Sequence, residues 1–305
     1  MKIGIQSYVT ATSIDPATLG RAIEDAGFDS YWAPDHAAIP VTPASPLPLP
    51  GGKFPDIYGQ MVDPFVSLSV MATATTDLRL VTGVCLVPER HPLMLAKLVS
   101  SLDLFSGGRV IFGAGTGYVP ELTEVFTPHH ATPWKLTIES LEAMKVLWAD
   151  GRGGFAGELV TFPEVVLDPM PVQRPHPPIV LGARPTPVAA RRVATVADGI
   201  YLTVVTPEEV AAARAAVTAE CERIGRDPAE IEISVSVHDP SPQVQRAFAD
   251  AGANRLVVML HNHDGKPLPM EDWMVRQTEN ILAPAPTPEE TLRSLEMVRE
   301  LAGLT

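Results

Sequence analysis

Residues 179–203 read IVLGARPTPVAARRVATVADGIYLT, and they contain one complete unit of a pattern that recurs along the chain. A short apolar run at 179–182 is followed by Thr186 and Pro187, by a helical segment at 187–197 and by a second apolar run at 199–203. A threonine side chain accepts a hydrogen bond from the first N–H groups of a helix, and proline suits the first helical position because it has no N–H to leave unpaired. The stretch therefore predicts a strand, a helix and a strand in succession, which is the unit of a parallel sheet.

This unit recurs eight times. We expect strands at residues 3–8, 28–33, 78–84, 109–113, 179–182, 199–203, 231–237 and 255–260, and helices at 16–26, 64–75, 92–105, 133–149, 187–197, 207–224, 242–251 and 288–301. Six of the helices follow a capping residue and a proline, and the capping residues are Asp15, Asp63, Thr186, Thr206, Ser241 and Thr287. Eight alternating units close into a (β/α)8 TIM barrel, which is an α/β fold. Because no linker interrupts the alternation, we expect one domain over residues 1–305.

Three segments interrupt the rhythm as insertions. Residues 36–60 form a long loop rich in proline and glycine, which we expect at the active site, and residues 151–177 predict a hairpin with strands at 158–162 and 165–167. Residues 261–285 form a loop after the eighth strand. Loops that follow the strands of a barrel carry its function, so the first and last of these segments are candidates for the substrate pocket. Their apolar side chains favour an apolar pocket, although local packing explains them equally well: Leu47, Leu49, Phe54, Tyr58, Trp273 and Met274.

Composition excludes several classes of partner. The formal net charge is −13, so the chain as a whole repels the phosphates of nucleic acids and of anionic membranes. The chain begins in a strand-like run without an apolar leader, and no apolar run approaches the roughly 18 residues of a membrane span. The two cysteines, Cys85 and Cys221, have no metal-like or redox-like spacing. We therefore expect a cytoplasmic protein with two buried, reduced thiols.

Polar residues follow several of the expected strands. Asp35 and His36 follow the second strand, where an aspartate beside a histidine can orient the imidazole or move a proton. A solvent-facing turn is the alternative. A glycine-rich segment, GAGTGY at 113–118, follows the fourth strand, and GARPTP at 182–187 follows the fifth. Glycines, a cation and a helix start suit a phosphate, although a tight turn and an ordinary capped helix explain both segments equally well.

Two other kinds of site fit the sequence poorly. The spacing GxGxG after a fourth strand does not match the GxGxxG of a nicotinamide Rossmann dehydrogenase, and Pro120 crowds the helix that should follow. His261 and His263, with Asp264, lie after the eighth strand, but no further ligand pattern supports a metal. We predict no metal site.

Five segments of the sequence resemble one known family. They are WAPDH at 32–36, TGVCLVPERHPL at 82–93, LDLFSGGRVIFGAGTG at 102–117, PVQRPHPPI at 171–179 and ADG at 197–199. Together they resemble the bacterial luciferase-like family of flavin and deazaflavin enzymes. The resemblance covers residues 2–203 and continues more loosely to the end of the chain.

The resemblance implies a barrel that holds the deazaflavin coenzyme F420, or FMN, in its mouth. The family often has a non-proline cis peptide at the end of the third strand, which here is Gly83–Val84 and would support the ring. His36 and Asp35 match the pair near the reactive face, and we take them as the catalytic candidates. The expected cofactor-binding residues are Asp35, Gly83, Val84, Thr116, Gly117, Tyr118, Gly182, Ala183 and Arg184.

The sequence also departs from its relatives at two of these positions. Tyr118 stands where the sugar-phosphate dehydrogenase branch has a glutamate, which argues against that branch and its substrate. Arg184 replaces a residue that is small in relatives, so it either strengthens phosphate binding or fills part of the pocket.

The resemblance leaves alternatives open on activity and partners. The leading prediction is an F420-dependent oxidoreductase that transfers a hydride to or from a small organic substrate. The alternatives are an FMN-dependent monooxygenase, which needs a separate reductase for its cofactor, and a non-catalytic flavin-binding barrel. The family also leads us to expect a homodimer.

Overall fold

Eight parallel strands form a closed barrel in the computed structural model, which describes residues 1–41 and 54–304. The strands are β1 (Lys2–Gln6), β2 (Ser30–Ala33), β3 (Arg79–Thr82), β5 (Val110–Gly115), β8 (Ile179–Gly182), β9 (Gly199–Thr203), β10 (Glu232–Val237) and β11 (Arg255–Met259). Neighbouring strands pair in the order β3-β2-β1-β11-β10-β9-β8-β5, and pairing between β3 and β5 closes the ring. A two-residue strand, β4 (Cys85–Leu86), extends the wall beyond β3 and pairs with β5. The predicted TIM barrel is confirmed.

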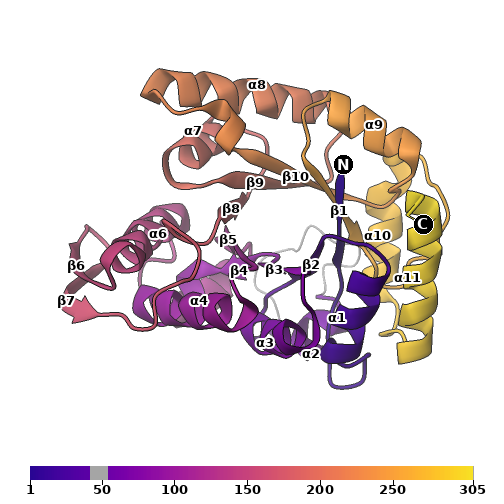
Figure 1. Ribbon diagram of the computed structural model, residues 1–305, viewed down its shortest axis with the longest axis horizontal. Helices are drawn as coiled ribbons and strands as arrows, with labels where there is room; N and C mark the ends of the chain where they lie inside the picture. The colour runs from indigo at the N-terminus through magenta and orange to yellow at the C-terminus, as the bar shows by residue number, and fades with distance from the viewer. Residues whose placement is uncertain (42–53, 305) are drawn as a thin grey trace.

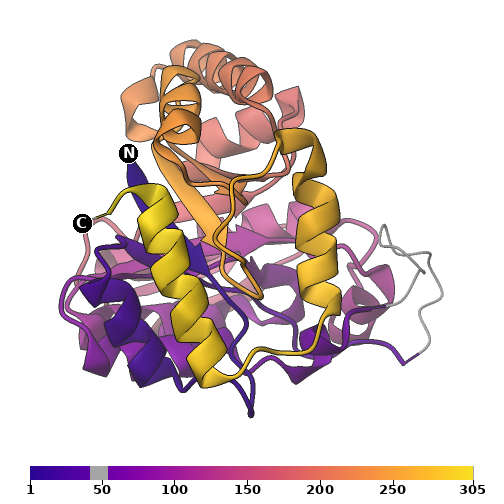
Figure 2. The ribbon, with the colours of Figure 1, turned by 90° about the vertical axis from the view of Figure 1, so that its right-hand side faces the viewer.

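In the described part of the chain, one helix after each barrel strand packs around the barrel, and each of these eight helices begins with a proline (Figure 1). They are α1 (Pro16–Asp25), α3 (Pro64–Ala74), α4 (Pro92–Ser106), α6 (Pro133–Asp150), α7 (Pro187–Val196), α8 (Pro207–Ile224), α9 (Pro242–Asp250) and α11 (Pro288–Ala302). Five of the six predicted capping side chains accept a backbone hydrogen bond, whereas Ser241 makes none. In Figure 2 the last helix, α11, lies beside the first, α1, so the ring of helices closes where the chain began.

The predictions missed three short helices and shifted one hairpin. The short helices are α2 (Asp56–Gln60) and α10 (Trp273–Leu282), which lie in the segments expected as loops, and α5 (Pro120–Phe126). The hairpin is formed by β6 (Arg152–Ala156) and β7 (Thr161–Val166), not by 158–162 and 165–167. The predicted bounds were wrong because the turn lies earlier in the chain, where the Gly157 N–H donates to the Val160 carbonyl at 2.9 Å.

Two apolar layers hold the barrel together. The larger layer fills the space between the strands and the helices, and it contains both cysteines, which are buried and free. The smaller layer fills the barrel interior with Trp32, Val81, Ile111, Val180, Tyr201 and Val257. The interior is crowded at Gly113, where an added Cβ would lie 1.9 Å from the Thr82 carbonyl oxygen, so only glycine fits there. Within the described ranges no helix combines the length and apolarity needed to cross a bilayer.

Candidate active site

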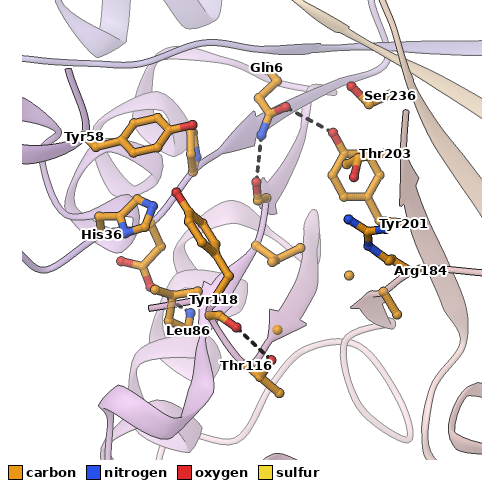
Figure 3. Close-up of a pocket in the computed structure, with 18 of the residues that line it drawn as sticks. Gln6, His36, Tyr58, Leu86, Thr116, Tyr118, Arg184, Tyr201, Thr203 and Ser236 are labelled. Carbon is orange, nitrogen blue, oxygen red and sulfur yellow. Dashed lines mark hydrogen bonds between the residues drawn. The ribbon is translucent and has the colours of Figure 1, made fainter. Parts of the chain in front are cut away.

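A cavity of about 700 Å³ opens at the end of the barrel where the strands terminate. This volume lies within the range of sites that hold cofactors and drug-sized ligands. The structure places every sequence-predicted site residue on its wall: Asp35, His36, Gly83, Val84, Thr116, Gly117, Tyr118, Gly182, Ala183 and Arg184. Segments that are distant in the sequence thus meet around one space, as Figure 3 shows for several of them.

Asp35 has both carboxylate oxygens engaged. Its side chain is 1% exposed, and it forms a two-pronged ion pair with Arg90, at 2.5 Å to Oδ2 and 2.9 Å to Oδ1. The backbone N–H of Leu86 also donates to Oδ2 at 2.9 Å. Such paired charged hydrogen bonds fix geometry strongly. Asp35 therefore ties the end of β2 to the segment that follows β3.

His36 is held between two tyrosines. Its ring stacks on Tyr58, with ring centroids 4.9 Å apart, and meets Tyr118 edge-on at 5.8 Å. Its Nδ1 atom is buried and has no hydrogen-bond partner in the described part of the chain. Burial lowers the pKa of His36, and the negative charge of Asp35 opposes that effect without cancelling it. The imidazole is therefore neutral at pH 7.

The Gly83–Val84 peptide bond is cis, as the resemblance implied. The Gln6 side-chain amide donates to the Gly83 carbonyl at 2.7 Å, and the Tyr201 hydroxyl donates to the Gln6 side-chain oxygen at 3.0 Å. Val84 then projects toward Gly115, where an added Cβ would lie 2.7 Å from a Val84 methyl group. Small residues around Val84 thus keep this side of the cavity open.

The turn after β5 carries the next predicted residues. Gly117 has φ +74°, a conformation that other residues rarely adopt, and the Thr116 hydroxyl donates to its carbonyl at 3.0 Å. Tyr118 follows and is half exposed at the rim. Behind the turn lies Glu89, which is 8% exposed. Burial and the charge of Asp35 raise the pKa of Glu89 to about 7, despite the nearby Arg90.

Two arginines lie at the opposite end of the cavity, beside the start of α7. Arg184 follows β8, and Arg192 lies on α7 with its guanidinium 4.5 Å from the ring centroid of Trp134. Neither arginine has a carboxylate within 4.0 Å among the residues that the structure describes. Thr186 caps α7 by accepting from the Ala189 N–H at 3.1 Å. Two unpaired cations and a helix N-terminus suit an anion such as a phosphate.

Several cavity residues escaped the sequence analysis. Besides Gln6, Arg192, Trp134 and Tyr201, the strands and helices of the second half of the barrel contribute Thr203, Ser236, Met259, Gln277 and Ile281. That half of the rim had no predicted role. Each of four residues occupies one of the last two positions of a strand: Gln6, Thr203, Ser236 and Met259. An inward-facing side chain at such a position is a signal that the sequence analysis could have used.

The residues expected to make an apolar pocket divide among three places. Tyr58 lines the cavity, whereas Phe54 packs against Val119 and Leu122 beside it. The Trp273 ring packs against Phe248 in a separate surface cavity of about 370 Å³, and Met274 is exposed. Leu47 and Leu49 lie outside the described residues.

A histidine cluster lies apart from this cavity. His238, His263 and Asp264 have ligand-type atoms within 4.8 Å of one another, whereas His261 lies elsewhere against Tyr8. Both ring nitrogens of His263 are already bonded, Nε2 to the His238 carbonyl at 2.7 Å and Nδ1 to the Gly265 N–H at 2.9 Å. Because metal binding would have to break one of these bonds, we propose no metal here.

Comparison with known proteins agrees with the fold. An uncharacterized protein of Mycobacterium tuberculosis is 35% identical over 215 residues, which are 69% of this chain and 74% of the relative. An F420-dependent hydroxymycolic acid dehydrogenase of the same species is 27% identical over 68% of this chain and 54% of the relative. The structure of a coenzyme F420-dependent tetrahydromethanopterin reductase from Methanopyrus kandleri superposes with a TM-score of 0.69 at 16% identity, over 100% of this chain and 99% of the other.

The family model for luciferase-like monooxygenases matches residues 9–302, which is nearly the whole chain. The match includes every strand of the barrel except β1 and all the residues of the cavity except Gln6 and Tyr8. The chain therefore belongs to the luciferase-like monooxygenase family.

Proposed function

We propose that this protein is an oxidoreductase that binds coenzyme F420 in the cavity and transfers a hydride between it and a small organic substrate. The observation that carries the proposal is the polarity of the cavity. One end has a free imidazole nitrogen on His36, and the other has the unpaired cations Arg184 and Arg192. The likeness to an F420-dependent dehydrogenase supports the choice of cofactor.

The residues present fit such a group. A Cβ added at Gly115 or Gly182 would meet a Val84 methyl group at 2.7 or 3.0 Å, so glycine at these positions makes room for the Val84 side chain at the cavity wall. We assign Gly83 and Val84 to the support of the ring, and Arg184 and Arg192 to the phosphate. When bound, the coenzyme supplies or accepts a hydride. The protein supplies orientation, exclusion of water and a proton.

Three residues have roles in hydride transfer in this proposal. His36 exchanges the proton that accompanies hydride transfer, because its neutral ring has a free nitrogen. Asp35 acts as a positioning residue, since its oxygens are occupied by Arg90 and Leu86. Gln6 fixes the Gly83 carbonyl and hence the cis peptide.

An FMN-dependent monooxygenase is the second candidate, and the description of the family itself favours it. A phosphate site serves FMN as well as F420. This function would require a separate reductase to supply reduced FMN.

We also propose that the protein forms a homodimer through the outer faces of α3 and α4, which lie side by side in Figure 1. No residue of α3 is charged, and Val66 and Val70 are exposed on it. On α4, Met94 and Leu98 are exposed, and so is Phe105 at 75%. An exposed apolar face of this kind marks an interface. A second copy is the occupant we expect, because two chains of charge −13 can meet there without apposing like charges.

Substitutions at two adjacent arginines, Arg191 and Arg192, test the cofactor assignment. Arg192→Gln should weaken F420 binding by about tenfold, since it removes one charged contact to an anion. Arg191→Gln is the matched control, because Arg191 is 66% exposed and faces Glu220 on α8. The measurement is the quenching of F420 fluorescence on titration with protein. Equal affinities for the two variants would contradict the assignment.

A further inference from the structure

The end of the cavity opposite the arginines has a distinct chemistry. Figure 3 shows His36, Tyr58 and Tyr118 on one side of the cavity and Arg184 across from them. Tyr8, Met259 and Ile281 complete this end, which we call the tyrosine end. It combines the hydroxyl groups of three tyrosines with the thioether side chain of Met259 and the aliphatic side chain of Ile281.

The described residues of the tyrosine end carry no net charge. Burial raises the pKa of Tyr8, of Tyr58 and of Tyr118, so their hydroxyls remain protonated throughout the physiological range. His36 is neutral at pH 7 because burial lowers its pKa. Among the described residues of the cavity wall, Asp35 is the one carboxylate, and Arg90 neutralises it.

The hydroxyls are arranged to hold an oxygen atom. Tyr8 and Tyr58 lie with ring centroids 5.9 Å apart, and the hydroxyls of Tyr8 and Tyr118 lie close enough to that of Tyr58 to affect its pKa. Protonated phenols donate hydrogen bonds to a carbonyl or hydroxyl oxygen. A carboxylate or phosphate at the same place would lose its hydration without meeting a positive charge, which is strongly unfavourable.

We propose that the tyrosine end binds a neutral substrate with a ketone or secondary-alcohol oxygen on an apolar or aromatic body, and that it rejects anionic substrates. The inference rests on the proposed function and names the substrate class for it. Tyr58 and Tyr118 are the specificity-determining residues, because their hydroxyls meet the substrate oxygen.

The reaction on such a substrate balances with the proposed cofactor alone. In reduction, the carbonyl carbon gains a hydride, the C=O π pair moves to the oxygen, and the oxygen gains one proton from His36, whose ring first takes that proton up from water. The reduced deazaflavin coenzyme provides the hydride and is oxidised by two electrons. Oxidation of the alcohol runs through the same transfers in reverse.

The test uses two probes of nearly equal size and shape, acetophenone and benzoate, of which only benzoate is charged at pH 7.5. Their dissociation constants are measured by saturation-transfer NMR on the protein with and without F420. We expect acetophenone to bind at least about tenfold more tightly than benzoate, as the desolvation penalty of the carboxylate requires. Tyr58→Phe and Tyr118→Phe should each weaken acetophenone binding by about threefold to tenfold, because each removes one hydrogen-bond donor.

Tyr31→Phe is the matched control, because the Tyr31 hydroxyl donates to the Ser7 carbonyl outside the cavity. Acetophenone affinity should be unchanged in this variant, and Tyr31→Phe and Tyr58→Phe should both retain F420 binding. Benzoate binding as tight as acetophenone binding, binding of neither probe at millimolar concentration, or unchanged affinity in both Tyr58→Phe and Tyr118→Phe would overturn the inference. Failure of F420 to bind would instead refute the proposed function, while the probe comparison without F420 would still decide the substrate class.

Discussion

His36 is the residue on which the proposed chemistry depends most. Its ring is clamped by Tyr58 and Tyr118, yet its Nδ1 has no partner among the described residues. A buried polar atom without a partner is unfavourable for folding, so its retention in the cavity is explained best by a ligand or a proton that it serves.

His36→Ala should lower turnover by about 100-fold or more, the size of a lost general acid–base contribution. Cofactor affinity should change little, because His36 lies across the cavity from Arg184. The measurement compares kcat with the F420 dissociation constant. Unchanged turnover would show that the proton comes from another group.

The protonation of His36 also predicts how the rate of alcohol oxidation depends on pH. Because burial lowers the pKa of His36 below 6.5, the imidazole stays neutral down to mildly acidic pH. Alcohol oxidation, which needs a neutral base, should lose rate only as the pH falls through that lowered pKa.

Residue-level contacts were the part of the site least accessible from the sequence. Asp35 and His36 stood out because they follow a strand, but the ion pair with Arg90 depends on closure of the barrel. Likewise, the sequence Arg191-Arg192 does not say which arginine faces the cavity. The packing of α7 against α6 and α8 decides that.

For helices and strands, the prediction from sequence succeeded where the local signals, such as a capping residue followed by proline, agreed with the final fold. Proline and a capping side chain marked the starts of most helices, and alternation of apolar runs marked all eight strands. Prediction failed at α10 and at the β6–β7 hairpin. Helix α10 is short and lies between proline-rich segments, and the glycines inside β6 are tolerated because the hairpin is an exposed two-stranded sheet.

The helix caps permit a test at this scale. Thr206 forms a capping box with Glu209, whereas Ser241 occupies the equivalent position of α9 without a side-chain cap. Thr206→Ala should reduce the free energy of unfolding by about 1 kcal/mol, and Ser241→Ala should reduce it much less. Urea denaturation followed by circular dichroism measures both. A loss for Ser241→Ala as large as that for Thr206→Ala would contradict the structure of α9.

For the whole molecule, the outer surface is uneven in polarity. The outer face of α3 and α4 is apolar, while helices such as α8 and α11 carry many charged side chains. The only ionisable side chains of α4, Lys97 and Asp103, bond to the segment at 168–173 and leave the outer face uncharged. This asymmetry is the structural basis for the proposed homodimer.

Val66→Glu combined with Met94→Glu should therefore produce a monomer, since two buried carboxylates in each subunit would lack partners in the interface. Leu292→Glu, on the exposed face of α11, is the control and should leave the dimer intact. Sedimentation velocity reports the mass of each variant. A wild-type monomer, or a doubly substituted dimer, would refute this interface.

The central claim is that the cavity at the barrel mouth holds F420 as its redox cofactor. The most direct measurement is an equilibrium titration of the protein with F420 and with FMN side by side, followed by fluorescence. The account predicts saturable binding of F420, about tenfold or more tighter than that of FMN. Tighter binding of FMN, or no binding of F420, would contradict it.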